Sequence, residues 1–378
     1  MCAVLVVGGG PAGIMTASEL SKNGWDVTLI EEHPKVGVPE NCSGLLSFTG
    51  LNELGIDAES CIVNKVYGAE VFSPSGHRIL IERTNPVAAV VSRKSFDEML
   101  LKEALKNGTK VEFESKLIDV RNENIFIQKK SRGELRKAKV IVGADGVHSR
   151  TREIIGIKPE RSHYVNSYQV RANGSFESKK VKLYLGSFAN GLFAWVIPEN
   201  SSIARIGIAT AHGINPKEAF DEFKKKYFLE FEKIEESSFT IPCGPPIPEP
   251  LKQNILLVGD AAFQVKATTG GGIIMGLNAA KMCAKAIDSM FRNGTSLDNY
   301  SVLIKPITKE LNTHWKIRSY INKLNDTTLD KLFIKAQKAK LGEFLSEHGD
   351  MDWPSRFLPK MLSKPSFWGF LPILLRFR

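Results

Sequence analysis

The sequence predicts an α/β protein (α+β overall) in which a parallel sheet covered on both faces is assembled from separate segments of the chain. A valine-rich apolar run at residues 3–7 and a second apolar run at residues 255–258 are typical of strands buried on both faces of such a sheet. Residues 164–241 are mostly of strand character with alternating apolar and polar positions, which is typical of an antiparallel sheet with one covered face. An antiparallel-sheet domain inserted into a parallel-sheet domain explains both patterns.

We expect three units along the 378 residues. The first combines residues 1–60, 92–153 and 251–293, the second combines 61–91 and 154–250, and the third is a helical C-terminal region, 294–378. Apolar spacing and turn residues further predict strands near 26–30, 111–114, 117–121, 125–128 and 138–142, and helices over 11–23 and 216–228 and from residues 95 and 272 onward. The composition, 43% hydrophobic and 24% charged, excludes disorder, collagen or a coiled coil as the main architecture.

The charge and the cysteines narrow the function only a little. Lys and Arg number 51 against 41 for Asp and Glu, and this excess attracts phosphate groups without choosing among their carriers. Five cysteines with no Cys-x-x-Cys pair argue against a disulfide framework or structural zinc, and we expect no metal. A strand begins almost at once and no apolar run reaches about 18 residues, so we expect a cytoplasmic protein without a signal peptide or membrane span.

A glycine fingerprint lies between the first strand and the first helix. Gly8 permits the tight turn, Gly10 lets the backbone approach a pyrophosphate, and Gly13 lets helix and strand pack closely. Glu31 follows 23 residues after Gly8 (31 − 8), near the roughly 20 expected for a carboxylate on a ribose diol. In this context the motif predicts a Rossmann-like dinucleotide site, although a glycine turn of another α/β protein stays open. The candidate contacts are Gly8, Gly10, Pro11, Ala12, Gly13 and Glu31.

Two later patches narrow the dinucleotide. Residues 143–146 (Gly-Ala-Asp-Gly) and 259–260 (Gly-Asp) each follow a buried strand, and 269–272 (Thr-Gly-Gly-Gly) opens a long helix. The pattern resembles the FAD-binding fold of the p-hydroxybenzoate hydroxylase class. That resemblance implies FAD, with Asp260 on the ribityl chain and the helix N-terminus at the flavin pyrimidine edge, where it stabilises negative charge. It also implies Arg93 near the phosphates and Leu117 near adenine, so that the further contacts are Arg93, Leu117, Asp145, Gly146, Asp260, Gly271, Gly272 and Ile273.

A cysteine loop and an aromatic strand extend the resemblance. Residues 39–44 (Pro-Glu-Asn-Cys-Ser-Gly) and 193–198 (Phe-x-Trp-x-Ile-Pro) resemble the geranylgeranyl reductases, most closely the archaeal digeranylgeranylglycerophospholipid reductases. The family places the loop at the reactive face of the flavin, which implies that Cys42 is catalytic and that Cys42 and Ser43 contact the cofactor. The sequence departs from the family at Ile197, at Ala209 and at residues 265–268, where an Asp-Pro pair is common.

The resemblance implies an FAD-dependent reductase that hydrogenates C=C bonds of geranylgeranyl chains in membrane lipid precursors, with hydride from reduced flavin N5. Cys42 donates or relays the proton or shapes the cavity, and an inert small residue is the alternative. Phe193 and Trp195 are candidate substrate contacts, as a tunnel wall, a packed sheet core or both. A monooxygenase or halogenase of the same fold is the first alternative; halogenases carry Trp-x-Trp-x-Ile-Pro, which differs here at Phe193. A non-enzymatic prenyl-binding module is the second.

The expected partners are an isoprenoid lipid and a transient electron donor, and no nucleic acid. Because no second glycine fingerprint follows, the donor is NAD(P)H bound transiently or a ferredoxin-like carrier protein. Residues 353–378 mix aromatic, leucine and cationic side chains and are interrupted by Pro365 and Pro372. This segment either lies in a membrane interface, making the protein peripheral, or docks on the body of the molecule.

Overall fold

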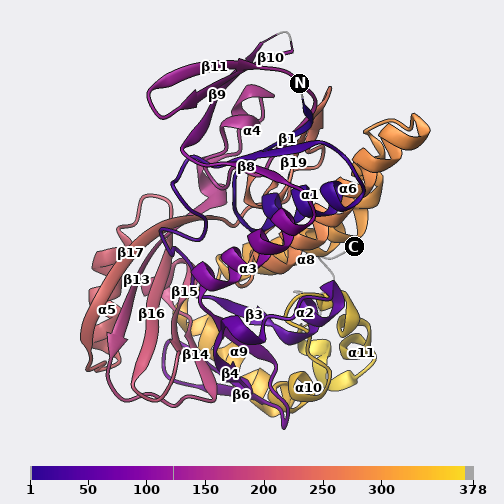
Figure 1. The fold of residues 1–378 in the computed structure, drawn as a ribbon. Helices are drawn as coiled ribbons and strands as arrows, with labels where there is room; N and C mark the ends of the chain where they lie inside the picture. Colours follow the sequence, from indigo (N-terminus) through magenta and orange to yellow (C-terminus); the bar gives the residue numbers. More distant parts are fainter. Residues whose placement is uncertain (1, 122, 371–378) are drawn as a thin grey trace.

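The computed structural model describes residues 2–121 and 123–370, and a six-stranded sheet forms its centre (Figure 1). The strand order is β18–β19–β12–β1–β2–β8, and every pair is parallel except the edge pair of β18 with β19. The strands are β1 (Cys2–Val7), β2 (Val27–Ile30), β8 (Lys110–Glu112), β12 (Ala138–Gly143), β18 (Leu251–Lys252) and β19 (Ile255–Leu257). Residues remote in sequence therefore meet at the carboxyl edge of one sheet, as the apolar runs predict.

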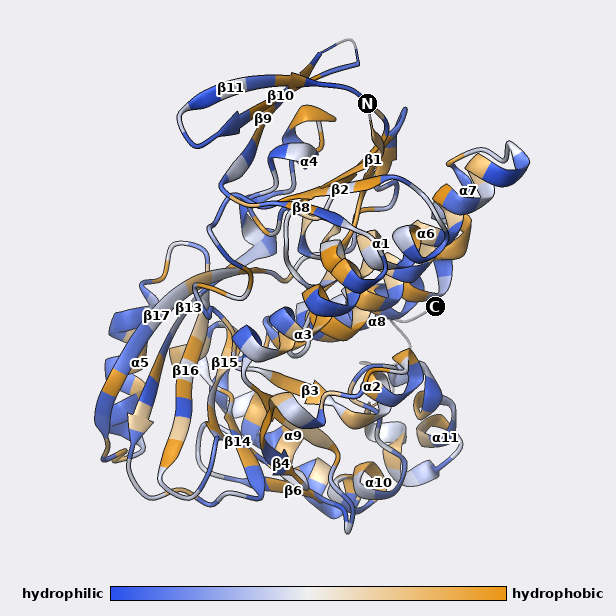
Figure 2. Cartoon of the chain, in the orientation of Figure 1, coloured by the Kyte–Doolittle hydropathy of each residue, from blue (hydrophilic) through white to orange (hydrophobic). Residues whose placement is uncertain are grey.

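Both faces of this sheet are covered. On one face lie α1 (Pro11–Lys22), α3 (Arg93–Lys106) and α6 (Ile273–Asn293), whose apolar sides share a core with β1, β2 and β12. On the other face lie α4 (Arg150–Ile154) and a three-stranded antiparallel sheet, β9 (Ser115–Arg121), β10 (Asn124–Lys129) and β11 (Arg132–Arg136). Figure 2 shows the hydrophobic residues concentrated in the central strands and on the inner sides of these helices.

A seven-stranded sheet forms the second unit, in the order β17–β13–β16–β15–β14–β5–β6. It is antiparallel except where β14 pairs with β5. Its members are β5 (Gly68–Phe72), β6 (Arg78–Glu82), β13 (Tyr164–Asn173), β14 (Lys180–Tyr184), β15 (Gly191–Pro198), β16 (Ile203–Ala211) and β17 (Glu232–Pro242). The helix α5 (Pro216–Lys226) packs Phe220 and Phe223 against the outer face of this sheet, which leaves the inner face of the sheet for the site.

Residues 61–91 divide between two sheets, which the sequence analysis did not anticipate. β5 and β6 join the large sheet, but β4 (Ile62–Val66) and β7 (Ala88–Val91) pair with β3 (Leu45–Ser47) in a separate three-stranded sheet. The short helix α2 (Phe48–Leu54) follows β3 directly. The cysteine loop before β3 is thereby tied to both units. The domain boundaries proposed above stay a prediction.

The C-terminal region is helical and closes one side of the molecule. It consists of α7 (Asn299–Leu303), α8 (Lys305–Ile321), α9 (Asp326–Lys338), α10 (Leu341–His348) and α11 (Leu358–Leu362). α9 and α10 pack against β6, and α8 runs along α6 (Figure 1). Short 3₁₀ helices occur at Glu59–Cys61, Arg161–His163, Ser187–Ala189, Gly259–Ala262, Pro354–Arg356 and Pro365–Phe370.

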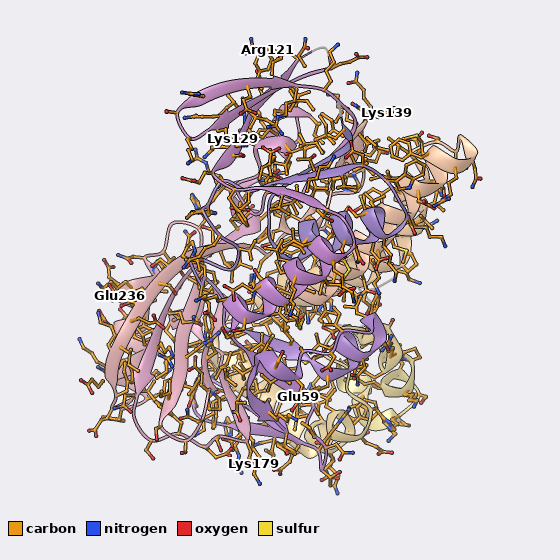
Figure 3. All side chains as sticks on the ribbon, viewed as in Figure 1. Glu59, Arg121, Lys129, Lys139, Lys179 and Glu236 are labelled. Carbon is orange, nitrogen blue, oxygen red and sulfur yellow. The ribbon has the colours of Figure 1, made fainter. Side chains whose placement is uncertain are left out.

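Much of the apolar tail is docked on this helical region. Phe367 and Phe370 are buried, and the Phe367 ring lies 5.0 Å from that of Phe344 on α10. Trp368 remains 55% exposed. Residues 371–378, with Pro372 and the last cations, lie outside the described residues. No helix in the described part of the chain is long and apolar enough to cross a bilayer. Charged side chains such as Arg121, Lys179 and Glu236 project from the periphery of the molecule (Figure 3).

Candidate active site

A cavity of about 1800 Å³ lies between the carboxyl edge of the parallel sheet and the inner face of the seven-stranded sheet. It exceeds the roughly 300–1,000 Å³ of a drug-sized pocket, so it has room for a dinucleotide and a second ligand. The candidate residues that line it are Gly8, Gly10, Glu31, Cys42, Ser43, Arg93, Leu117, Asp145, Gly146, Phe193, Trp195, Asp260, Gly271, Gly272 and Ile273. Pro11, Ala12 and Gly13 do not line it, because the first turn of α1 carries them behind the fingerprint.

The fingerprint glycines meet three different steric demands. Gly8 has φ +106°, and a Cβ there would lie 2.3 Å from the carbonyl oxygen of Ala144. A Cβ on Gly13 would lie 2.0 Å from the carbonyl oxygen of Gly8, so the helix could not approach the strand. A Cβ on Gly10 would meet no atom within 4 Å. The space beside Gly10 belongs to the cavity, as expected where the backbone approaches a ligand.

Glu31 lies against the fingerprint. One carboxylate oxygen, Oε2, accepts a hydrogen bond from the backbone N–H of Gly9 at 2.6 Å. The other, Oε1, accepts from the backbone N–H of His33 at 2.9 Å and lies 2.5 Å from its ring Nδ1. The carboxylate is therefore held at the end of β2, at the edge of the cavity.

The two strand-end aspartates differ in what they bind. Asp145 accepts from the Ser149 hydroxyl at 2.5 Å and from the N–H and hydroxyl of Thr151 at 2.8 and 2.9 Å, so its carboxylate fixes the start of α4. The carboxylate of Asp260 has no hydrogen-bond partner among the described residues, although it lines the cavity. Burial raises the pKa of Asp260, and Arg93 and Arg152 oppose this rise. A half-buried acceptor that lines the cavity without a partner among the described residues fits a ligand hydroxyl such as those of a ribityl chain.

The N-terminus of α6 also faces the cavity, which Gly271, Gly272 and Ile273 line, and no side chain of the described residues caps it. The N-cap residue is Gly272. Free N–H groups and the positive end of a 21-residue helix dipole favour an anionic group here. The unpartnered carboxylate, the space at Gly10 and this helix end together fit FAD, which supplies hydride chemistry when bound.

The cysteine loop is held by side chains of the inserted sheet. Arg205, only 6% exposed, donates to the carbonyl oxygen of Cys42 at 3.2 Å and to the Glu40 carboxylate at 2.9 Å. Gln169 donates to the same carbonyl at 3.3 Å. The Sγ of Cys42 accepts from the N–H of Gly44 at 3.3 Å. These contacts fix the loop while the thiol lines the cavity.

Arg93 connects this loop to the nucleotide-binding unit. Its guanidinium binds both oxygens of Asp97, at 3.0 and 2.8 Å, and its backbone N–H donates to Glu40 at 3.0 Å. Burial lowers the pKa of Arg93, but the Asp97 carboxylate and the Cys42 sulfur more than offset this and hold the pKa above its usual value. A permanent cation thus stands beside the thiol.

The aromatic pair on β15 is both a cavity wall and part of a packed core. Phe193 and Trp195 line the cavity, and their ring centroids lie 6.1 Å apart at 80°. The Trp195 indole N–H donates to Gln169 at 3.1 Å, which links the ring to the cysteine loop. A Cβ on Gly207 would lie 2.4 Å from the Trp195 ring, so the glycine makes room for the indole.

Several site residues escaped the sequence analysis. Arg205 and Gln169 are single polar residues on strands, and nothing in their spacing singles them out. On α8, Glu310, His314 and Arg318 are buried polar residues at i, i+4 and i+8, a stripe on one helix face that could have been noticed. Arg318 donates to the carbonyl oxygens of Leu192, Ala267 and Thr268 at 2.8–3.0 Å.

Comparison with known proteins agrees with this geometry. Residues 1–229 match the family model described as FAD binding domain. A digeranylgeranylglycerophospholipid reductase of Methanococcus vannielii is 30% identical over 353 residues, which cover 87% of this chain and 89% of that protein. This chain belongs to the geranylgeranyl reductase family of FAD-binding proteins.

Structural comparison agrees with that assignment. The crystal structure of a geranylgeranyl bacteriochlorophyll reductase-like protein from Thermoplasma acidophilum is 26% identical and superimposes with a TM-score of 0.86 over 98% of this chain and 99% of that chain. A flavin-dependent brominase is 16% identical with a TM-score of 0.71, over 100% of this chain and 98% of that one, and shares the fold alone. The predictions of an FAD-binding fold, of FAD as cofactor and of an oxidoreductase are confirmed.

Proposed function

We propose that this geranylgeranyl reductase family member hydrogenates C=C bonds of geranylgeranyl chains in membrane lipid precursors, and that Cys42 lies beside the reacting carbons. The supporting observation is that Cys42 lies in the same cavity as Gly10 and Asp260 and as an apolar region from the inserted sheet. That region is lined by Val66, Ala69, Val71, Val181, Leu183, Phe193 and Trp195. An isoprenoid chain matches it in polarity.

We assign the cofactor contacts to both nucleotide and flavin ends of this cavity. Gly8, Gly10 and Glu31 would hold the pyrophosphate and ribose, and Leu117 the adenine. Asp260 would bind the ribityl chain, and the helix end at Gly271–Ile273 the pyrimidine edge. An isolated alkene accepts hydride poorly, so the residues contribute by aligning it, excluding water and supplying a proton at the second carbon. The Cys42 thiol, set between Arg93 and the apolar region, is our candidate for moving that proton.

Anaerobic turnover tests the proposal. Chemically reduced protein is incubated with geranylgeranyl lipids without O₂, and mass spectrometry should detect gains of two hydrogens per reduced bond. Loss of all turnover under these conditions, with O₂-dependent product instead, would identify a monooxygenase or halogenase. Purified protein that binds no FAD would favour a prenyl-binding module.

Cys42 is tested separately. C42A and C42S should bind FAD as the unsubstituted protein does and lose at least about tenfold in turnover, since general acid–base catalysis contributes roughly 10²–10⁴-fold. C2S is the matched control, because Cys2 is also a partly exposed free cysteine but lies at the far end of β1. Full turnover in both Cys42 variants would remove the thiol from the mechanism.

The electron donor and the membrane contact are part of the same proposal. NAD(P)H and a reduced ferredoxin-like carrier should be compared as donors by the anaerobic bleaching of the bound FAD. Trp368 is half-exposed, and Lys360 and Lys364 precede it by eight and four residues in the chain, a combination that favours contact with an anionic bilayer. Cosedimentation with anionic but not neutral vesicles would support this contact, and its loss in a W368A variant would locate it.

A further inference from the structure

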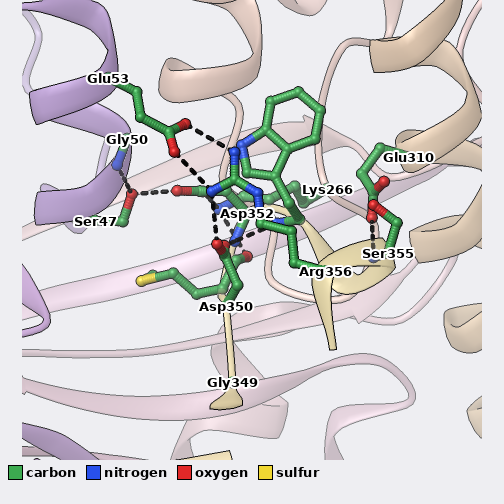
Figure 4. Close-up of polar contacts among 12 residues, drawn as sticks. Ser47, Gly50, Glu53, Lys266, Glu310, Gly349, Asp350, Asp352, Ser355 and Arg356 are labelled. Carbon is green, nitrogen blue, oxygen red and sulfur yellow. Dashed lines mark hydrogen bonds and ion pairs between the residues drawn. The ribbon is translucent and has the colours of Figure 1, made fainter. Parts of the chain in front are cut away.

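A buried ion pair lies at the wall of the cavity, beside the turn that opens α6 (Figure 4). Lys266 and Asp352 are 4% and 0% exposed, and Nζ lies 2.5 Å from Oδ1. Nζ also donates to the carbonyl oxygen of Met351 at 3.3 Å, and the second oxygen of Asp352 accepts from the Ser47 hydroxyl. The pair joins the C-terminal segment to the two units that form the cavity.

The cation of this pair is the end that faces the cavity. Lys266 is a lining residue, whereas Asp352 is not. A Cβ on Gly271 would lie 3.1 Å from Cε and 3.4 Å from Nζ of Lys266, so the ammonium rests against the glycine turn. The backbone reinforces this, because Lys266 and Gly271 are bridged by an N–H···O bond of 3.2 Å. The pair is therefore a dipole with its positive end at the turn.

Charged and polar groups from several elements also face this turn. Arg318, also buried, binds three carbonyl oxygens and forms no ion pair with a carboxylate of the described residues. His314 is neutral: Nε2 donates to the carbonyl oxygen of Asp352 at 3.1 Å and Nδ1 accepts from the Thr268 hydroxyl at 2.5 Å. Burial and the nearby Lys266 lower the pKa of His314 to about 4. Two cations, Lys266 and Arg318, and two carboxylates, Asp352 and Asp260, thus surround the turn, and a Cβ on Gly272 would lie 2.8 Å from Oδ1 of Asp260.

We infer that Lys266 raises the reduction potential of the bound flavin and that Asp352 moderates this effect. The inference rests on the proposed seat of the isoalloxazine at the α6 N-terminus. A reduced flavin carries negative charge at its pyrimidine edge, and a nearby cation in a water-poor site stabilises it more than the neutral oxidised ring.

The two partners of the pair make opposite predictions. K266M removes the cation and should weaken the binding of reduced relative to oxidised FAD at least tenfold, which is about 30 mV more negative for a two-electron couple. D352N removes the compensating charge while keeping an oxygen for Ser47, and should shift the potential in the positive direction. K266R should stay within threefold of the unsubstituted protein. A purely structural pair would move K266M and D352N the same way.

The matched control is K281M, which removes a partly buried cation on α6 itself, hydrogen-bonded to the carbonyl oxygen of Leu54. K281M should change the affinity for reduced relative to oxidised FAD less than threefold. The potentials are measured on FAD-loaded protein by anaerobic dye equilibration, with thermal unfolding of each variant alongside. If D352N does not fold, K266M against K266R decides the question.

Equal potentials in K266M and K281M, or shifts of the same sign in K266M and D352N, would overturn the inference. This failure differs from failure of the proposed function. If the protein binds FAD and reduces the lipid but K266M leaves the reduction potential unchanged, only this inference fails. If G272A binds FAD as tightly as the unsubstituted protein, the proposed position of the flavin at the α6 turn fails as well.

Discussion

The fingerprint turn at residues 8–13 and the turn at residues 266–272 both open a helix toward the same cavity, yet they are built differently. The first is shaped by backbone: Gly8 and Gly13 touch main-chain atoms, and Glu31 is 22 residues from its Gly9 partner. The second is fixed by side chains from distant elements, with Lys266 86 residues from Asp352. Asp352 in turn is 305 residues from Ser47. A backbone-built turn leaves a legible sequence motif, whereas a side-chain-built turn does not.

We expect the largest effect from a substitution that disrupts the backbone-built turn. G13A places a Cβ 2.0 Å from the carbonyl oxygen of Gly8, which no side-chain movement relieves. We expect the free energy of unfolding to fall by at least about 4 kcal/mol, and we expect FAD binding to be lost as well. Urea denaturation of the apoprotein measures it.

G10A is the partner experiment, because its Cβ meets no protein atom within 4 Å. It should keep the stability of the unsubstituted protein but weaken FAD, since only the ligand competes for that space. Equal stability losses in G13A and G10A would contradict the distinction between packing and ligand approach.

The next effect probes the side-chain-built turn through pH. The folded protein holds the pKa of His314 at about 4, below the usual value near 6.5, chiefly through burial. The unfolded chain therefore takes up this proton first, and the stability that the neutral form contributes is complete above about pH 6.5 and is lost as the pH falls toward 4. The loss amounts to about 3 kcal/mol.

H314Q should flatten this decline, and denaturation midpoints between pH 7 and 4 will show it. H212Q serves as the control, since His212 is exposed. If H314Q loses stability with acid as steeply as the unsubstituted protein, His314 is not the responsible group.

A smaller effect extends the comparison to the inserted sheet. G207A would drive a Cβ to 2.4 Å from the Trp195 ring and should cost about 2 kcal/mol, because the indole must shift from its place against Gln169. Tryptophan fluorescence and urea denaturation report the shift and the cost. G133A, where a Cβ meets nothing within 4 Å, should leave both unchanged.

We expect the smallest loss of stability from removing a partly exposed ion pair, that of Glu112 with Arg136 and Lys129. Arg136 and Lys129 lower the pKa of Glu112 to about 2 against the opposing effect of burial. This stability is present above the unfolded pKa near 4.5 and lost as the pH falls through about 2. Because water reaches the group, E112Q should cost below about 1 kcal/mol at pH 7. A cost comparable to that of G207A would show that these surface pairs rival buried packing.

Much of the fold follows from local pattern. Buried strands, the fingerprint helix and the long helix after Gly272 have apolar periodicities that a short window reveals, and the observed elements match them within a few residues. The strand β11 was missed because Arg132–Arg136 is polar on both faces and pairs only at an edge. The separation of β4 and β7 from the large sheet was missed because partner choice depends on tertiary packing, which no window contains.

The site divides in the same way. Glycines and strand-end aspartates were predictable because ligand approach demands those residue types at fixed offsets. The prediction could not distinguish the unpartnered Asp260 from Asp145, whose oxygens are used by Ser149 and Thr151. Arg205 was beyond reach for a related reason, since its hold on the Cys42 carbonyl spans 163 residues.

Asp352 reaches the ribosomal exit after every group that it contacts, including Ser47, Lys266 and His314. A growing chain can therefore close its nucleotide-binding turns while the ammonium of Lys266 still lacks its anion. The carboxylate that balances the charge of Lys266 is thus the last of these groups to be synthesised.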